Sequence, residues 1–213
     1  MNTDALIRSL AENVKAVPRH AVGRRLALGI FAGAVVSLVA ILSGLGIRPD
    51  LILAMQGSSF WVKWAYTASL GIGAIAMIAR LARPDTVRLR WMWLIAVPIV
   101  LLAGLAALEM AHAPPAEWLA MWLGHSWKQC PWLVLMLSAP IFVGLLWSFR
   151  RLAPTRLRLA GATAGLAAGA CAATLYCLHC PEVSAIFVLT WYTLGIGLAA
   201  AIGAILGPRL LRW

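Results

Sequence analysis

Six long apolar stretches constrain the fold of this chain more than any other feature. They cover about residues 26–46, 60–81, 91–111, 131–149, 159–178 and 186–206. Each is close to the roughly 20 residues that an α-helix needs to cross the hydrocarbon core of a bilayer. The stretches are continuous and do not alternate in polarity, which argues against an outer-membrane β-barrel. With 62% hydrophobic and 12% charged residues, the chain is also too apolar for a soluble domain. We therefore predict an all-α membrane protein, in which a six transmembrane helix bundle occupies residues 26–213.

The basic residues predict how this bundle is oriented. The net charge of +11 could indicate nucleic-acid binding, but 15 of the 18 Lys and Arg residues lie before the first apolar stretch, around alternate connections, or after the last stretch. The other side carries only Arg48, Lys63 and Lys128. By the positive-inside rule, both termini are cytoplasmic and the loops 47–59, 112–130 and 179–185 face outward. We expect the bilayer, and not nucleic acid, to be the partner of these charges, with Lys63 extending to the outer head groups.

Residues 1–25 contain a short cytoplasmic N-terminal amphipathic helix in this prediction. Thr3 or Asp4 can cap it, and the apolar residues that follow have the spacing of one helical stripe. A helix of this length is marginal in water and needs a surface to lie on. That surface is either the membrane or a cytosolic protein. The residues concerned are Asp4, Leu6, Ile7, Leu10 and Val14.

The four cysteines carry the distinctive chemistry of the sequence. Cys171 lies within the fifth stretch and is expected to be a packing residue. Cys130, Cys177 and Cys180 lie at the predicted outer ends of helices, on the side where disulfides form and persist. The middle of every stretch lacks an acid or a base, which argues against an ion-coupled transporter.

Several chemistries could use the segment "TLYCLHCPEVSAIF", residues 174–187. Attachment of a c-type haem needs Cys-x-x-Cys-His, and Pro181 stands where that histidine would be. A zinc ion could use Cys177, His179 and Cys180 together with Cys130 or His125. Cys177 and Cys180 also have the Cys-x-x-Cys spacing of thiol oxidoreductases.

A pairing of Cys130 with Cys180 is a further possibility. Each precedes a proline at the same predicted membrane depth. If the fourth and fifth helices are neighbours, the two α-carbons can come within disulfide range, about 4.4–6.8 Å. We expect no cofactor and no permanent metal ion, although a soft metal ion could bind transiently at Cys130 and Cys180.

Segments along the whole chain resemble one known family. They are "TDALIRSLAENVKAVP", "GIRPDL", "SSFWVKWAYT", "LGHSWKQC", "LAPTRLRLAGATAG" and "YCLHCPEVSAIFVLTWYTLGI". Together, and in this order, they are similar to the NrsF family of six-span inner-membrane anti-sigma factors.

The resemblance implies a non-enzymatic regulator in the bacterial inner membrane. Its cytoplasmic side would sequester an extracytoplasmic-function sigma factor, and residues 1–25 are the segment that we expect to bind it. Two family cysteines, which match Cys130 and Cys180, would sense oxidants or thiophilic heavy metals at the outer face. Cys177, His179 and His125 are possible auxiliary residues. The alternative is a membrane thiol-disulfide oxidoreductase that uses Cys177, Cys180 and Cys130 with a quinone.

Overall fold

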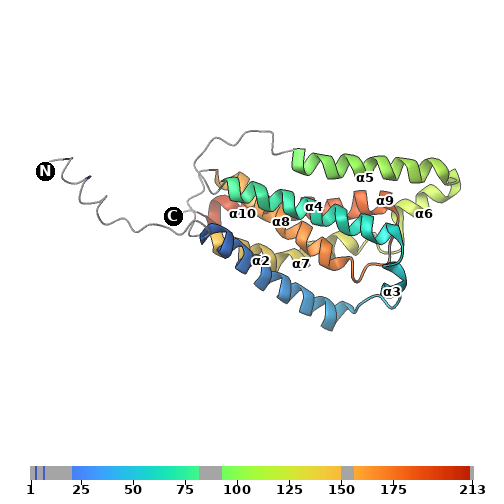
Figure 1. Ribbon diagram of the computed structural model, residues 1–213, viewed down its shortest axis with the longest axis horizontal. Helices are drawn as coiled ribbons and strands as arrows, with labels where there is room; N and C mark the ends of the chain where they lie inside the picture. The colour runs from blue at the N-terminus through green and yellow to red at the C-terminus, as the bar shows by residue number, and fades with distance from the viewer. Residues whose placement is uncertain (1–2, 4–6, 8–20, 82–92, 150–155, 212–213) are drawn as a thin grey trace.

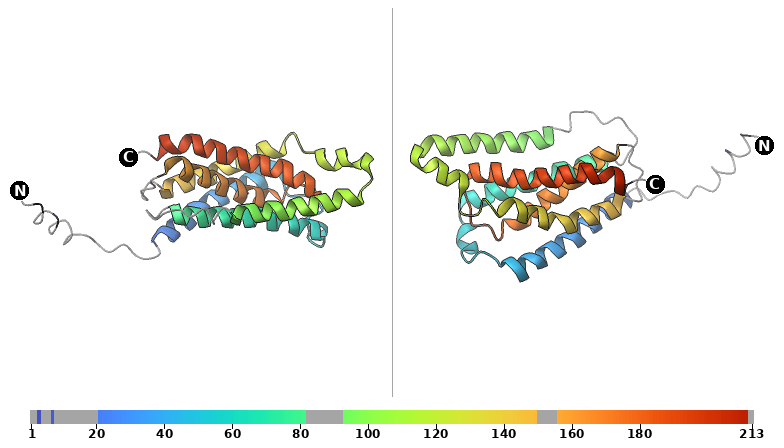
Figure 2. Two further views of the ribbon diagram at one scale, coloured as in Figure 1. Left: turned by 90° about the horizontal axis from the view of Figure 1, so that it is seen from above. Right: turned by 180° about the vertical axis from the view of Figure 1, so that it is seen from behind.

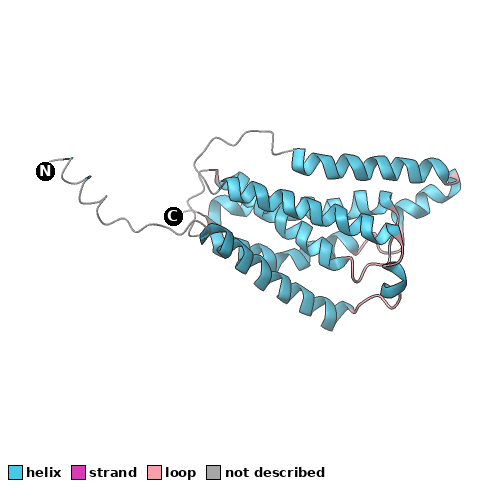
Figure 3. Ribbon diagram, viewed as in Figure 1, coloured by secondary structure: helices cyan, strands magenta, loops and turns pink. Residues whose placement is uncertain are grey.

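The computed structural model describes residues 3, 7, 21–81, 93–149 and 156–211. These ranges form a bundle of helices and contain no strand (Figures 1 and 3). Six helices within them are long and apolar enough to cross a membrane: Gly23–Leu45, Ser58–Leu81, Trp93–His112, Cys130–Phe149, Leu157–Tyr176 and Ala185–Leu210. The predicted all-α fold with six spans is therefore confirmed, with helix ends that differ by a few residues.

The six crossings are built from the following elements. The first is α2 (Ala21–Ala40), extended by a π-helical turn, η1 (Ile41–Leu45). The next four are α4 (Ser58–Leu81), α5 (Trp93–His112), α7 (Cys130–Phe149) and α8 (Leu157–Tyr176). The last joins α9 (Ala185–Phe187), a π-helical turn η4 (Val188–Tyr192) and α10 (Thr193–Leu210). Short helices lie in two connections: α3 (Leu51–Ala54), η3 (Pro115–Glu117) and α6 (Trp118–Leu123).

Helix α8 is the centre of the bundle, and α10, α4 and α7 pack around it. Its contact with α10 is made of glycines, because a Cβ added at Gly161 or Gly203 would collide with the backbone of the other helix. Gly29 of α2 and Gly144 of α7 meet in the same way. Small residues at this spacing let membrane helices approach closely.

Helix α5 lies at the edge of the bundle, where Figure 1 shows it set apart from the other long helices. Its main neighbours are α4 and α9, and its buried residues are Leu102 and Ala106. The apolar side chains on its remaining surface suit a lipid environment, because acyl chains can cover them without cost.

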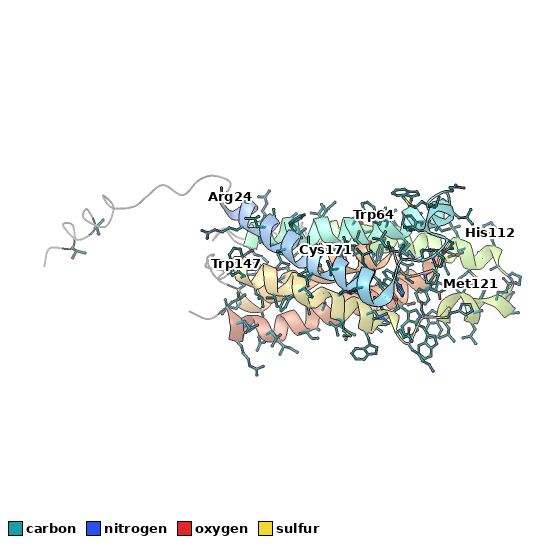
Figure 4. All side chains as sticks on the ribbon, turned by 90° about the horizontal axis from the view of Figure 1, so that it is seen from below. Arg24, Trp64, His112, Met121, Trp147 and Cys171 are labelled. Atoms are coloured by element: carbon teal, nitrogen blue, oxygen red, sulfur yellow. The ribbon has the colours of Figure 1, made fainter. Side chains whose placement is uncertain are left out.

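The two ends of the bundle are distinguished by the segments that lie there. The start of α2 and the end of α10 lie at one end, and α3 and α6 lie at the other (Figures 1 and 2). Figure 4 places Arg24 and Trp147 towards the first end, and Trp64, His112 and Met121 towards the second. We call the second end the outer end, following the charge-based prediction of orientation.

Candidate functional site

Cys130 and Cys180 meet at the outer end of the bundle. Cys130 begins α7, and its amide donates to the Ser126 carbonyl at 2.9 Å. Cys180 ends the turn after α8, with its amide bonded to the Tyr176 carbonyl at 3.0 Å. Both side chains are fully buried, both thiols are free, and the two lie close enough to affect each other's ionisation. The pairing of Cys130 with Cys180 required the fourth and fifth crossings to be neighbours, and α7 does pack along α8.

A third thiol shares the enclosed space. Cys177 is fully buried, and its Sγ donates to the Ala173 carbonyl at 3.2 Å. It lies close enough to Cys180 for the two to interact electrostatically, and burial raises the pKa of Cys177 to about 11. Cys171 is separate from this group, since it lies beside Gly71 in the contact between α8 and α4, as expected for a packing residue.

The histidines of the sequence-based zinc site do not join the thiols. His179 Nδ1 lies 2.8 Å from the Gly46 carbonyl oxygen, and the ring packs against Tyr176 at 5.6 Å between centroids. The His125 side chain is exposed to solvent. Within the described ranges, no three His, Cys, Asp or Glu side chains are grouped so that they could hold a metal ion.

Lys63 was expected to reach the outer head groups, and that prediction is wrong. Its side chain is 1% exposed and points inward from α4. The ammonium donates to the carbonyl oxygens of Cys180 at 2.9 Å and Glu182 at 2.8 Å. The turn after α8 leaves these carbonyls without helical partners, so they offer a buried cation acceptors that the apolar span itself lacks.

Arg48 supports the same turn from the connection between η1 and α3. Its guanidinium lies 3.4 Å from the Cys180 carbonyl oxygen and forms an ion pair with Asp50 at 2.6 Å. The bond to Arg48 lowers the pKa of Asp50. Two cations from separate segments therefore converge on the backbone of Cys180.

Glu182 connects this turn to the segment that leads into α7. One carboxylate oxygen accepts from the amides of His125 at 2.7 Å and Ser126 at 3.2 Å, and from the Ser126 hydroxyl at 3.2 Å. Gly124 permits this approach: its φ of 54° is left-handed, and a Cβ there would lie 2.6 Å from the Glu182 carboxylate. Sequence reasoning missed Glu182, although a carboxylate two residues after Cys180 in a short outer loop was a usable signal.

Tyr192 closes the site from the last crossing. It ends the π-helical turn η4, a feature that often re-aims side chains at functional sites. Its ring is fully buried, and none of the described residues hydrogen-bonds to its hydroxyl. The thiols of Cys177 and Cys180 are polar groups that this hydroxyl faces.

These surroundings favour the ionised form of Cys180. The hydrogen bond from the Cys130 thiol and the nearby Lys63 ammonium lower the pKa of Cys180 to about 6, although burial opposes them. A thiolate is the form of cysteine that attacks oxidants and disulfides. The arrangement can therefore form a disulfide between two neighbouring sulfurs, starting from Cys180.

The segment expected to bind a protein partner is mostly outside the described residues. Asp4, Leu6, Leu10 and Val14 all lie there. Ile7 is described, as a helical residue with 60% of its surface exposed. Its role and the boundary at residue 25 stay predictions.

Comparison with known proteins adds an independent observation. A family model described as "NrsF: Negative regulator of sigma F" matches residues 10–213. A probable anti-sigma-F factor NrsF from Azospira oryzae is 42% identical over 214 residues, and an anti-sigma-F factor NrsF from Caulobacter vibrioides is 40% identical over 215. Each alignment covers 100% of both chains. No solved structure matches.

Proposed function

Because this chain belongs to the NrsF family, we propose that it is a multi-pass membrane anti-sigma factor controlled by its Cys130–Cys180 pair. The family consists of regulators and not of enzymes, so the thiol oxidoreductase alternative has no support from it. We propose further that the partner is an extracytoplasmic-function sigma factor, bound on the cytoplasmic side of the bacterial inner membrane.

The observation that carries the sensory part is the buried contact between the thiols of Cys130 and Cys180. They come from helices that are consecutive crossings, α7 and α8, so a bond between them clamps two crossings at one end. Oxidation is the stimulus that this geometry supports best, because the sulfurs already adjoin as they must before a disulfide forms. Thiophilic metal ions are the second stimulus to test.

The free energy of one disulfide can be compared with the free energy needed to release the sigma factor. Moving a partner from almost fully bound to almost fully free takes a difference of about 5.5 kcal/mol between the two states. A single disulfide typically contributes about 2–4 kcal/mol. The bond alone therefore falls short, and the oxidised state must also disturb other contacts around Cys180.

Residues 1–25 are the segment through which we propose that the sigma factor is held. Its apolar stripe has the spacing by which an amphipathic helix fills a groove on a partner. The positive-inside rule assigns this segment to the cytoplasm, together with the basic connections of the bundle. Sensing and binding would then occur on opposite sides of the membrane.

The test is a pull-down of the full chain from membranes, with and without hydrogen peroxide or a cadmium salt. Wild type should retain a sigma factor without either reagent and release at least about 90% of it after oxidation. Cys130→Ser and Cys180→Ser should retain it under both conditions. Cys171→Ser is the matched control, because this cysteine lies outside the thiol group, and it should respond as wild type does.

Three results would contradict separate parts of the proposal. Recovery of no sigma factor in any state removes the anti-sigma assignment for this chain. Normal release by both serine variants removes the sensory role of the pair and leaves the partner intact. Release by cadmium alone replaces oxidation with metal binding as the stimulus.

A further inference from the structure

Lys63 is a buried cation whose carboxylate partner is missing from the described residues. Its ammonium is bonded to two backbone carbonyls, which stabilise a positive charge without neutralising it. The ion pairs among the described residues are Arg48 with Asp50 and, when protonated, His125 with Glu182. An ammonium inside a low-dielectric region needs an opposite charge nearby to offset the cost of leaving water.

Titratable groups surround this ammonium from every element packed against it. They are Cys130 on α7, Cys177 at the end of α8, Cys180 and Glu182 on the following turn, Tyr192 on η4, Arg48 before α3, and Glu109 on α5, which lines the same cavity as Lys63. The Tyr192 ring lies under the ammonium, 5.7 Å from the nitrogen to the ring centroid. The Glu182 carboxylate is already engaged by the amides of His125 and Ser126, and the Glu109 carboxylate accepts from the Ala185 amide at 2.7 Å.

Cys180 is the group in this set that is built to carry the negative charge. Its sulfur lies 3.9 Å from the Ser126 hydroxyl oxygen, and the neighbouring Cys130 thiol and the Lys63 ammonium both favour its charged form. Its own carbonyl anchors the Lys63 ammonium at 2.9 Å, so the cation and the thiol belong to one fixed turn. The neighbouring Cys177 instead directs its thiol to the Ala173 carbonyl, as a neutral donor does.

We propose that Lys63 is a positioning residue that holds Cys180 as a thiolate, and that disulfide formation removes the anion which offsets its buried charge. This inference rests on the proposed sensory role of the Cys130–Cys180 pair and supplies a trigger for it. The signal then has two parts: a new covalent bond, and the loss of the negative charge that lay beside Lys63.

The chemistry with hydrogen peroxide as the oxidant shows where the charge goes. The Cys180 thiolate attacks one peroxide oxygen, the O–O bond breaks, and Cys180 becomes a sulfenic acid while hydroxide leaves. The Cys130 sulfur then attacks the Cys180 sulfur, and the S–O bond breaks as the S–S bond forms. The Cys130 proton leaves with this oxygen as water. Two electrons have passed from the sulfurs to peroxide, and the negative charge has left the site as hydroxide.

A cavity lies beside Lys63. It has a volume of about 220 Å³ and lies between the outer ends of α4 and α5 and the start of the last crossing. Lys63 forms part of its wall, together with Ser58, Ser59, Glu109 and Val183. The polar groups among them, which are the two serine hydroxyls, the Lys63 ammonium and the Glu109 carboxylate, suit a small water-soluble molecule such as peroxide.

The change of charge acts on α4, which is tied to its neighbours by polar contacts near Lys63. Tyr66 bonds to Thr193 of α10 at 2.6 Å, and Thr174 of α8 donates to Thr67 at 3.0 Å. A cation left without its anion gains by moving towards water, and the helix that carries it must move with it. Loss of the thiolate therefore loosens the outer end of α4 from the turn at Cys180.

The test measures the oxidation of Cys180 in the full chain, reconstituted in lipid nanodiscs, with Cys171 and Cys177 replaced by alanine. Mass spectrometry follows the Cys180 thiol during reaction with hydrogen peroxide at a series of pH values. Lys63→Met should raise the midpoint of the rate profile by ~1–3 pH units, the range set by one nearby charge. Lys63→Arg should keep the midpoint of the starting protein, because the positive charge is kept. Lys128→Met removes an outer cation that lies over Trp127, and it should change nothing.

A second measurement does not depend on a Lys63 variant that folds. The ultraviolet absorbance of thiolate near 240 nm is compared between the starting protein and Cys180→Ser at neutral pH. The starting protein should show the additional band, and its absence would overturn the inference, as would an unchanged rate profile in Lys63→Met. Neither experiment contains a sigma factor. If the pull-down recovers no sigma factor but Lys63→Met still raises the midpoint of the rate profile, the proposed function is refuted and the role of Lys63 stands.

Discussion

The contact between Glu182 and the segment before α7 gives a prediction that can be worked out from the structure. Glu182→Ala removes three hydrogen bonds to one carboxylate, from two amides and one hydroxyl. Hydrogen bonds to a charged group contribute about 1.5–3 kcal/mol each when buried. Because His125 is exposed, water can replace part of the loss there. A net cost of about 2 kcal/mol is therefore expected, confined to the outer end of the bundle.

The assay for this prediction is the rate at which maleimide labels Cys130 and Cys180 in nanodiscs. Both thiols are fully buried, so labelling reports the fraction of molecules in which the outer turn has opened. A local loss of about 2 kcal/mol raises that fraction about 30-fold. Glu182→Gln keeps an acceptor oxygen and should give an intermediate rate, whereas Glu117→Ala removes an exposed carboxylate of the same outer region and should match wild type. Labelling of Glu182→Ala at the wild-type rate would refute the reasoning.

Three further outcomes are expected. Gly124→Ala should lower the thermal unfolding temperature. The left-handed φ of Gly124 costs about 1–2 kcal/mol for other residues, and a Cβ there would meet the Glu182 carboxylate. Gly57→Ala is the control and should leave the unfolding temperature unchanged. Gly203→Leu should cost more than about 3 kcal/mol in a denaturant titration, since overpacking forces α8 and α10 apart, and Gly197→Leu on the same helix faces open space and should cost little. The pKa of Cys180 is lowered to about 6, so its charge stabilises the fold above the ordinary thiol pKa and this stabilisation is lost as the pH falls through about 6. The unfolding temperature of wild type relative to Cys180→Ser should therefore decline over that range, and a constant difference would contradict the charge assignment.

The six crossings could be predicted because their cause is local. An apolar run of about 20 residues needs no information about its neighbours to be placed in a bilayer. Glycines recur at every fourth position in α8 and α10, a spacing that indicates close helix packing but not which helices meet. The meeting of Cys130 and Cys180 depended on α7 and α8 being neighbours, which consecutive crossings often are.

The surroundings of the thiols could not be predicted in the same way. Lys63 was assigned to the head groups because snorkelling is the usual outcome for a lysine near the end of a span. Its true partners are carbonyls of a turn more than one hundred residues later, freed by the end of α8. Glu182 and Gly124 form a similar long-range contact, which becomes visible only when two outer loops are folded against each other. The positions of these polar side chains thus depend on backbone donors and acceptors far away in the sequence. The spacing of apolar residues along the chain carries no information about such contacts.

The glycine contact between α8 and α10 has a mechanical consequence. Backbones that touch without intervening side chains leave little room to slide, so this contact acts as a fulcrum for α8. A helix of 20 residues is about 30 Å long, and a shift of about 2 Å at its outer end is a tilt of about 4°. The contact runs from Leu157 to Gly169 and holds this part of α8 against α10, so the end of α8 that leads to Cys180 is the part left free to tilt.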